Sequence, residues 1–179
     1  MSGVRNIIVA GLGGQGVLKV TDILAEALFK AGFDVKKSEV HGMSQRGGSV
    51  SSEVRYGDEV ASPMVPAGEA DVLAVLEAGQ LEVVRPLLRE GGAVIIPDDL
   101  PLDQLKNPKA LNTMMLGALS RHIDLPEEIF IAALKANFPE KLHEVNVEMF
   151  RLGRNFRESS GICALCTCKK QEQVLYYAS

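Results

Sequence analysis

A short apolar run that leads into closely spaced glycines and then into a helix constrains the fold of this chain most. Residues 7–10 are apolar, and residues 11–16 contain four glycines. The segment after them has apolar residues at helical spacing, namely Val17, Val20, Ile23, Leu24, Ala27, Leu28 and Ala31. Gly32 ends this helix, and residues 34–40 are predicted to form the next strand. This order predicts a strand–helix–strand unit, which is typical of layered α/β folds.

The segment after this unit has the pattern of a hairpin. Residues 49–56 alternate as a half-buried strand does, and residues 57–59 predict a turn. We expect residues 59–62 to pair back as a short antiparallel strand, which Pro63 and Pro66 end because proline has no backbone N–H. The sequence therefore predicts a hairpin that decorates the strand–helix–strand core.

The rest of the chain continues the alternation of strands and helices. The pattern predicts buried strands at 70–76 and 93–96 and helices at 80–89, 111–122, 126–136 and 140–154. We expect an α/β fold of three layers, with a mainly parallel central sheet, flanking helices and the added antiparallel hairpin. Residues 1–157 are expected to form one domain, and residues 158–179 a tail that contains the cysteines.

Composition and charge exclude several classes of function. The formal net charge is -4, there is no tryptophan, and only three tyrosines and six phenylalanines are present. With no run of Lys and Arg, nucleic-acid binding is not expected. No apolar run approaches the roughly 18 to 20 residues that span a membrane. Residues 1–6 lead into the first strand without the pattern of a signal peptide, so we expect a cytoplasmic protein.

A second glycine-rich motif, residues 39–50, follows the second strand of the predicted unit. Open α/β sheets bind ligands at the carboxyl ends of their strands, where both glycine motifs are expected to lie. Arg46 has a planar guanidinium that can pair with a carboxylate or phosphate, and Gln15 and Gln45 offer amide donors. We expect Arg46 to contact an anion or an acidic residue of a partner. The alternative is an ion pair with Glu39 inside the chain.

The first glycine motif has three interpretations. Its spacing matches the dinucleotide fingerprint, and Glu39 stands about where an acidic residue would hold the ribose, which predicts an NAD(P)- or flavin-binding redox protein. The glycines could instead serve only close packing of helix and strand. In the third interpretation they meet a partner subunit or the cofactor that it holds. The candidate cofactor-binding residues are Gly11, Gly13, Gly14, Gln15, Gly16, Gly47 and Gly48.

His41 and the cysteines are the remaining chemically active residues. His41 could donate a proton near neutral pH, although a hydrogen bond to the backbone is the commoner role of such a histidine. Cys163, Cys166 and Cys168 supply three ligands, whereas a closed zinc or cubane site needs about four. We expect reduced thiols and no metal site.

The two glycine motifs together resemble one family. Residues 11–16 and 38–48, with Asn112–Ala118 further on, are similar to the gamma component of 2-oxoacid:ferredoxin oxidoreductases. Within that family the sequence of residues 43–50 most resembles the small, or beta, subunit of indolepyruvate oxidoreductases. The resemblance covers residues 6–154.

The resemblance implies an accessory catalytic subunit of a heteromeric enzyme. That enzyme decarboxylates a 2-oxoacid oxidatively, forms an acyl-CoA and reduces ferredoxin, and its large subunit holds thiamine diphosphate and 4Fe-4S clusters. This chain would bind no cofactor alone and would be inactive alone. Its two glycine loops would face the large subunit near the thiamine site or the coenzyme A path, with Arg46, Gln45, His41 and Glu39 as catalytic candidates. A purely structural subunit is the third alternative, beside the nucleotide-binding protein.

Overall fold

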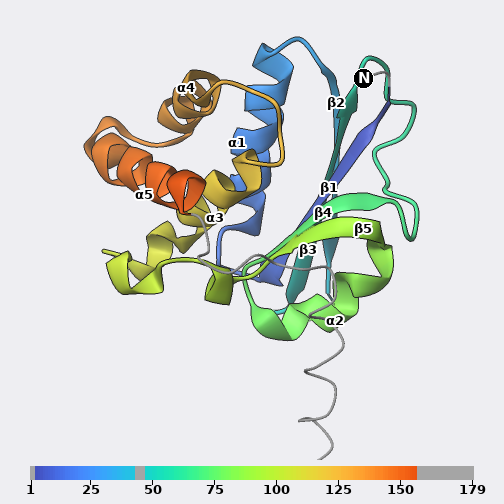
Figure 1. The fold of residues 1–179 in the computed structure, drawn as a ribbon, viewed down its shortest axis with the longest axis horizontal. Helices are drawn as coiled ribbons and strands as arrows, with labels where there is room; N and C mark the ends of the chain where they lie inside the picture. Colours follow the sequence, from blue (N-terminus) through green and yellow to red (C-terminus); the bar gives the residue numbers. More distant parts are fainter. Residues whose placement is uncertain (1–2, 43–46, 157–179) are drawn as a thin grey trace, which may run out of the picture.

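The computed structural model of this chain describes residues 3–42 and 47–156, and in them a five-stranded sheet with helices packed beside it (Figure 1). The strands are β1 (Arg5–Leu12), β2 (Asp34–His41), β3 (Ser49–Gly57), β4 (Ala70–Val75) and β5 (Leu88–Ile95). The α-helices are α1 (Val17–Lys30), α2 (Leu81–Val84), α3 (Leu111–Ser120), α4 (Glu127–Asn137) and α5 (His143–Asn155). Several short 3-10 turns connect them, mainly between residues 78 and 110.

The sheet has the order β2-β3-β1-β4-β5. β4 is parallel to both β1 and β5, whereas β3 is antiparallel to both β1 and β2. Four of the five strands therefore point the same way, and β3 alone is reversed. The predicted α/β fold, with a central sheet in which most strands share one direction, is confirmed.

The hairpin itself is built differently from the prediction. β2 and β3 form it, and β3 lies inside the sheet between β2 and β1. Both edges of β3 are thus occupied, so residues 59–62 have no free edge to pair with and form no strand. The Val60 N–H instead bonds the Asp34 carboxylate at 2.8 Å. The prediction of a decorating hairpin with a strand at 59–62 was wrong.

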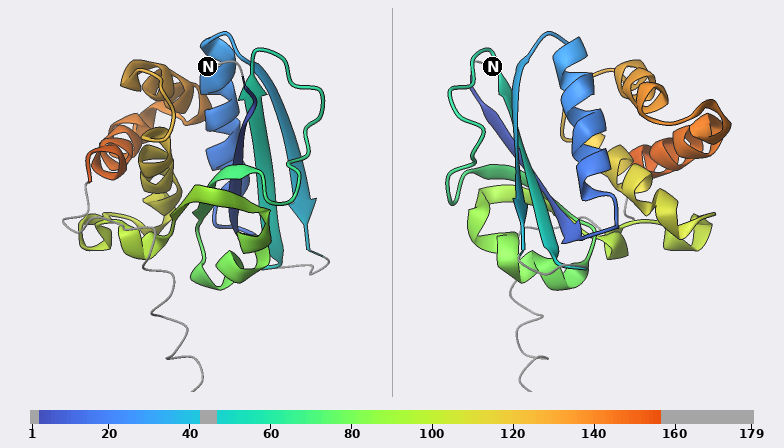
Figure 2. Two further views of the ribbon diagram at one scale, coloured as in Figure 1. Left: turned by 45° about the vertical axis from the view of Figure 1, so that its right-hand side comes forward. Right: turned by 180° about the vertical axis from the view of Figure 1, so that it is seen from behind.

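Four helices cover one face of the sheet. Figure 2 shows α1 against the sheet, and α3 also contacts the sheet at β4 and β5, with α4 and α5 further out. The apolar face of α1 is buried as its spacing predicted, and Thr21 on this face meets the buried Ser52 hydroxyl of β3 at 3.0 Å. α3 packs against α5, and Phe130 of α4 stacks on Phe150 of α5. None of the described helices is long and apolar enough to cross a membrane.

The opposite face carries a thinner third layer. The segment 58–69 and the short helix α2 cover it, with Val65 and Val84 buried against Ile8 and Leu73. Glu53 of β3 is buried and accepts the Val65 N–H at 2.7 Å, which holds the segment on the sheet.

The helix predicted at residues 80–89 is shorter than expected. α2 has four residues and a 3-10 turn with Pro86 follows it, after which β5 starts at Leu88 instead of residue 93. Proline has no N–H for the helical hydrogen bond and its ring clashes with the preceding turn.

Tyr56 of β3 makes the stability of the core on the helical face sensitive to alkaline pH. Its ring meets Phe33 edge-on, with 5.3 Å between the ring centroids, and the side chain is buried. Burial is the main cause that raises the pKa of Tyr56 above its usual value. Because the folded-state pKa is the raised one, this stabilisation is present below a pH of about 10 and is lost as the pH rises through the folded pKa.

We therefore expect Tyr56→Phe to lessen the fall in melting temperature above a pH of about 10. At neutral pH the substitution should change the free energy of unfolding by less than about 1 kcal/mol, because the ring remains. Thermal unfolding followed by circular dichroism, at a series of pH values for both proteins, measures this difference. An equal alkaline loss in wild type and variant would contradict the assignment to Tyr56.

Candidate functional site

The two glycine motifs meet at the edge of the sheet where β1 and β2 end. The Gly13 N–H donates to the Gly48 carbonyl at 2.9 Å, and the Gly42 N–H donates to the Ser49 carbonyl at 2.7 Å. A Cβ on Gly13 would lie 3.7 Å from the Gly47 nitrogen, so the two loops are in close contact. The sequence placed both motifs at one edge, and the structure joins them by a direct hydrogen bond.

The loop between β1 and α1 is held by the side chain of Gln15. Its Oε1 accepts the Leu12 N–H at 2.8 Å, and its Nε2 donates to Glu77 Oε2 at 3.0 Å. Glu77 follows β4, so the side chain links the ends of two parallel strands. The amide that the sequence offered as a donor to an anion is used within the chain.

Gly16 makes a left-handed turn at the start of α1. Its φ is 86°, a conformation that other residues rarely adopt. A Cβ here would lie 2.3 Å from the Asn112 side-chain nitrogen, so α3 also closes on this loop. Gly14, by contrast, is exposed, and a Cβ there would meet nothing within 4 Å. The loop is closely packed at its base and open at its tip.

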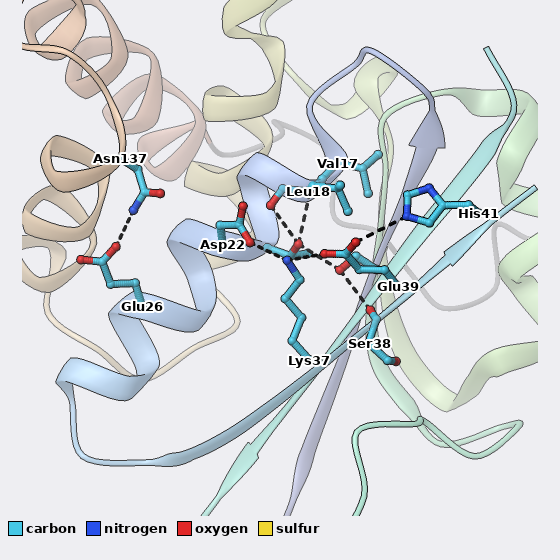
Figure 3. Close-up of polar contacts among 11 residues, drawn as sticks. Val17, Leu18, Asp22, Glu26, Lys37, Ser38, Glu39, His41 and Asn137 are labelled. Atoms are coloured by element: carbon cyan, nitrogen blue, oxygen red, sulfur yellow. Dashed lines mark hydrogen bonds and ion pairs between the residues drawn. The ribbon is translucent and has the colours of Figure 1, made fainter. Parts of the chain in front are cut away.

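Glu39 and His41 lie on the face of β2 that looks toward α1 (Figure 3). Glu39 Oε1 lies 2.8 Å from Lys37 Nζ, and Glu39 Oε2 lies 3.4 Å from His41 Nε2. The hydrogen bond from Lys37 is the main cause that lowers the pKa of Glu39. Glu39 is therefore an ionised acceptor with a partner at each oxygen.

This geometry does not fit a dinucleotide site. In a doubly wound sheet the ribose-binding acid stands on the strand beside the one that leads into the glycine loop. Here β3 lies between β1 and β2, so Glu39 is two strand spacings, or about 10 Å, away from β1. The Gly13 N–H that would approach a pyrophosphate is bonded to Gly48.

Some predicted site residues lie outside the described part of the chain. These are Gln45 and Arg46, with the alternative pair between Arg46 and Glu39, and the tail with Cys163, Cys166 and Cys168. Within residues 3–42 and 47–156, no three His, Cys, Asp or Glu side chains gather as metal ligands would.

Sequence reasoning missed several residues that build this edge. Glu77 could have been found, since it directly follows a predicted buried strand and must lie beside Gln15. Asn112 belongs to the third motif of the family resemblance, but the sequence assigned it no role. Asp22 and Lys37 carried no signal, because charged residues on a helix or a strand usually lie in solvent.

Comparison with known proteins places this geometry in context. The family model described as pyruvate ferredoxin/flavodoxin oxidoreductase matches residues 6–156. The indolepyruvate oxidoreductase subunit IorB of Methanothermobacter thermautotrophicus is 35% identical, over 83% of this chain and 95% of that protein. The pyruvate synthase subunit PorC of Methanothermobacter marburgensis is 28% identical, over 84% of this chain and 96% of that protein.

A solved structure has the same fold. The gamma subunit of a keto/oxoacid ferredoxin oxidoreductase from Geobacter sulfurreducens superposes with a TM-score of 0.71 at 24% identity. The match covers 84% of this chain and 96% of that chain. At this identity the likeness shows the shared fold alone.

Proposed function

Because the chain belongs to the pyruvate ferredoxin/flavodoxin oxidoreductase family, we propose that it is the small subunit of a 2-oxoacid:ferredoxin oxidoreductase that acts on indolepyruvate or a similar aryl pyruvate. The complex would release carbon dioxide from the oxoacid, join the acyl group to coenzyme A and pass the electron pair to ferredoxin. The observation that carries the substrate class is the 35% identity to an indolepyruvate oxidoreductase subunit along nearly its whole length. A place in cytoplasmic amino-acid catabolism suits this substrate.

The cofactors belong, in this proposal, to the large partner subunit. Thiamine diphosphate stabilises the carbanion left by decarboxylation, and 4Fe-4S clusters carry the electrons. The described residues of this chain offer a glycine-rich edge, which suits a contact with a cofactor held elsewhere. Anions such as a diphosphate or coenzyme A bind well where glycines leave backbone N–H groups accessible.

Within this proposal the two glycine loops form the face toward the large subunit. The open tip at Gly14 allows a partner or cofactor to approach the backbone, and Gln15 and the Gly13–Gly48 bond keep the loops in register. Arg46 and Gln45 would contact an anion, and Glu39 would orient the His41 imidazole toward the same loop.

Copurification and a substrate panel test the proposed function. The tagged chain would be isolated without oxygen from its host, and viologen reduction would be measured with thiamine diphosphate, coenzyme A and a series of 2-oxoacids. We expect a larger iron–sulphur subunit to copurify and indolepyruvate to give the highest kcat/KM. A preference for pyruvate would reassign the substrate, and a chain that is isolated alone and binds NAD(P)H or flavin would contradict the proposal.

Arg46→Ala should weaken the assembled enzyme if this side chain contacts an anionic group. Removal of a charge-assisted hydrogen bond of about 1.5 to 3 kcal/mol corresponds to a rise of roughly 10- to 150-fold in the KM for coenzyme A or the oxoacid. Arg151→Ala is the matched control, since Arg151 lies on α5 and pairs with Glu127 at the surface. Unchanged kinetics and assembly in Arg46→Ala would exclude the contact.

A further inference from the structure

A row of four charged or titratable side chains runs from α1 along β2 to the loop that joins β2 and β3. Lys37, Glu39 and His41 alternate along the strand and share the face toward α1, and Asp22 of α1 stands opposite them (Figure 3). Lys37 Nζ lies 2.5 Å from Asp22 Oδ1 and 2.8 Å from Glu39 Oε1. The second Glu39 oxygen reaches His41, so every member of the row contacts the next.

Lys37 is the least exposed of the four side chains in this row. Its side chain is 21% exposed, against 35% for Glu39 and 55% for His41. Partial burial acts to lower the pKa of Lys37, but the hydrogen bonds to Asp22 and Glu39 outweigh it and hold this pKa above its usual value. The ammonium therefore stays charged and neutralises two carboxylates that would otherwise repel each other.

The row leads to the face that the proposed function assigns to the large subunit. His41 is the last residue of β2 and stands at the start of the loop that returns through Gly47 and Gly48. α1, which carries Asp22, begins directly after the first glycine loop. The ammonium of Lys37 thus connects the elements that bear both loops, on the side of the sheet away from the Glu53 contact with segment 58–69.

We propose that Lys37 is a positioning residue for His41 at the end of β2, because it holds Glu39 in place and Glu39 in turn holds the His41 imidazole. The inference rests on the proposed function, since it assigns Lys37 to the support of a side chain at the sheet edge that faces the partner subunit. An ordinary surface ion pair would contribute little to stability and nothing to catalysis. A positioning residue affects turnover by the partner complex more than it affects folding.

The test compares two neighbouring lysines of the same strand. Lys36 faces the opposite side of β2 and pairs with Asp34, so Lys36→Met is a matched control for Lys37→Met. In the assembled enzyme we expect Lys37→Met to lower kcat/KM roughly tenfold, a size typical of coupled contacts, with little change in melting temperature. Lys37→Arg should recover most of the activity, and Lys36→Met should match wild type.

Two further measurements separate this proposal from the proposed function. In a Glu39→Gln background, Lys37→Met should add almost no further loss, because Lys37 acts through Glu39; an additive loss would overturn the proposal. The imidazole NMR signal of His41 can be assigned in the full chain without its partner, because the His41→Gln variant lacks it. The chemical shift of this signal should change in Lys37→Met and remain the same in Lys36→Met. An unmoved signal would overturn the positioning role even if no 2-oxoacid were turned over, whereas a moved signal in an inactive complex would count against the proposed function alone.

Discussion

Gly117→Ala is expected to lower the free energy of unfolding by at least about 3 kcal/mol, which corresponds to a fall of roughly 6 to 12 °C in melting temperature. α3 and α5 cross so closely here that an added Cβ would lie 2.0 Å from the Phe150 carbonyl oxygen. The neighbour is backbone, so no side-chain rotation can make room and the two helices must separate. Alanine favours a helix over glycine by about 1 kcal/mol, and the overlap must outweigh that gain.

Gly153 supports the same crossing from α5. A Cβ on Gly153 would lie 2.0 Å from the Met114 carbonyl oxygen, so Gly153→Ala should have a similar effect. Gly79→Ala is the control, because Gly79 is exposed and a Cβ there would meet nothing within 4 Å. Chemical denaturation of the three variants measures the effect. If Gly117→Ala and Gly79→Ala were equally stable, the close crossing of α3 and α5 would be wrong.

The fold was predictable wherever one local pattern decides the outcome. The apolar spacing of residues 17–31 predicted α1, and the buried run at 70–76 predicted β4 almost to the residue. The position of β3 was not predictable, because alternation identifies a strand but does not say which strands it pairs with. The helix predicted at residues 80–89 was too long because the apolar spacing continues through Pro86, where the chain turns into β5.

The residues of the candidate site were easier to predict than the contacts between them. Glycine-rich loops after two strands indicated one sheet edge, and Gly13 and Gly48 meet there. The dinucleotide interpretation of Glu39 failed on topology, since the insertion of β3 cannot be inferred from the spacing of motifs. Lys37 went unnoticed because a charged residue on a strand usually lies in solvent, and only the packing of α1 on β2 brings Asp22 to it.

Gln15→Glu should destabilise the sheet edge where the two glycine loops meet, because it replaces a hydrogen-bond donor with a second negative charge. The native amide nitrogen lies 3.0 Å from Glu77 Oε2, so the new carboxylate would face another carboxylate at this distance. Breaking a partly buried hydrogen bond in this way costs about 1 to 3 kcal/mol of stability. If the displaced loop loses the same free energy in the transition state, kcat/KM of the assembled enzyme falls roughly 5- to 150-fold. Unfolding free energy and viologen reduction together measure the effect.

A second substitution can restore the hydrogen bond with its direction reversed. In the double variant Gln15→Glu with Glu77→Gln, the new amide at position 77 can donate to the new carboxylate at position 15, while the other oxygen still accepts the Leu12 N–H. We expect the double variant to recover most of the stability and activity. The single variant should also recover partly in mild acid, because two facing carboxyl groups can then share a proton. If the double variant were as impaired as Gln15→Glu, the loss would not come from the contact between positions 15 and 77, and the bond that joins β1 to the end of β4 would carry no energy.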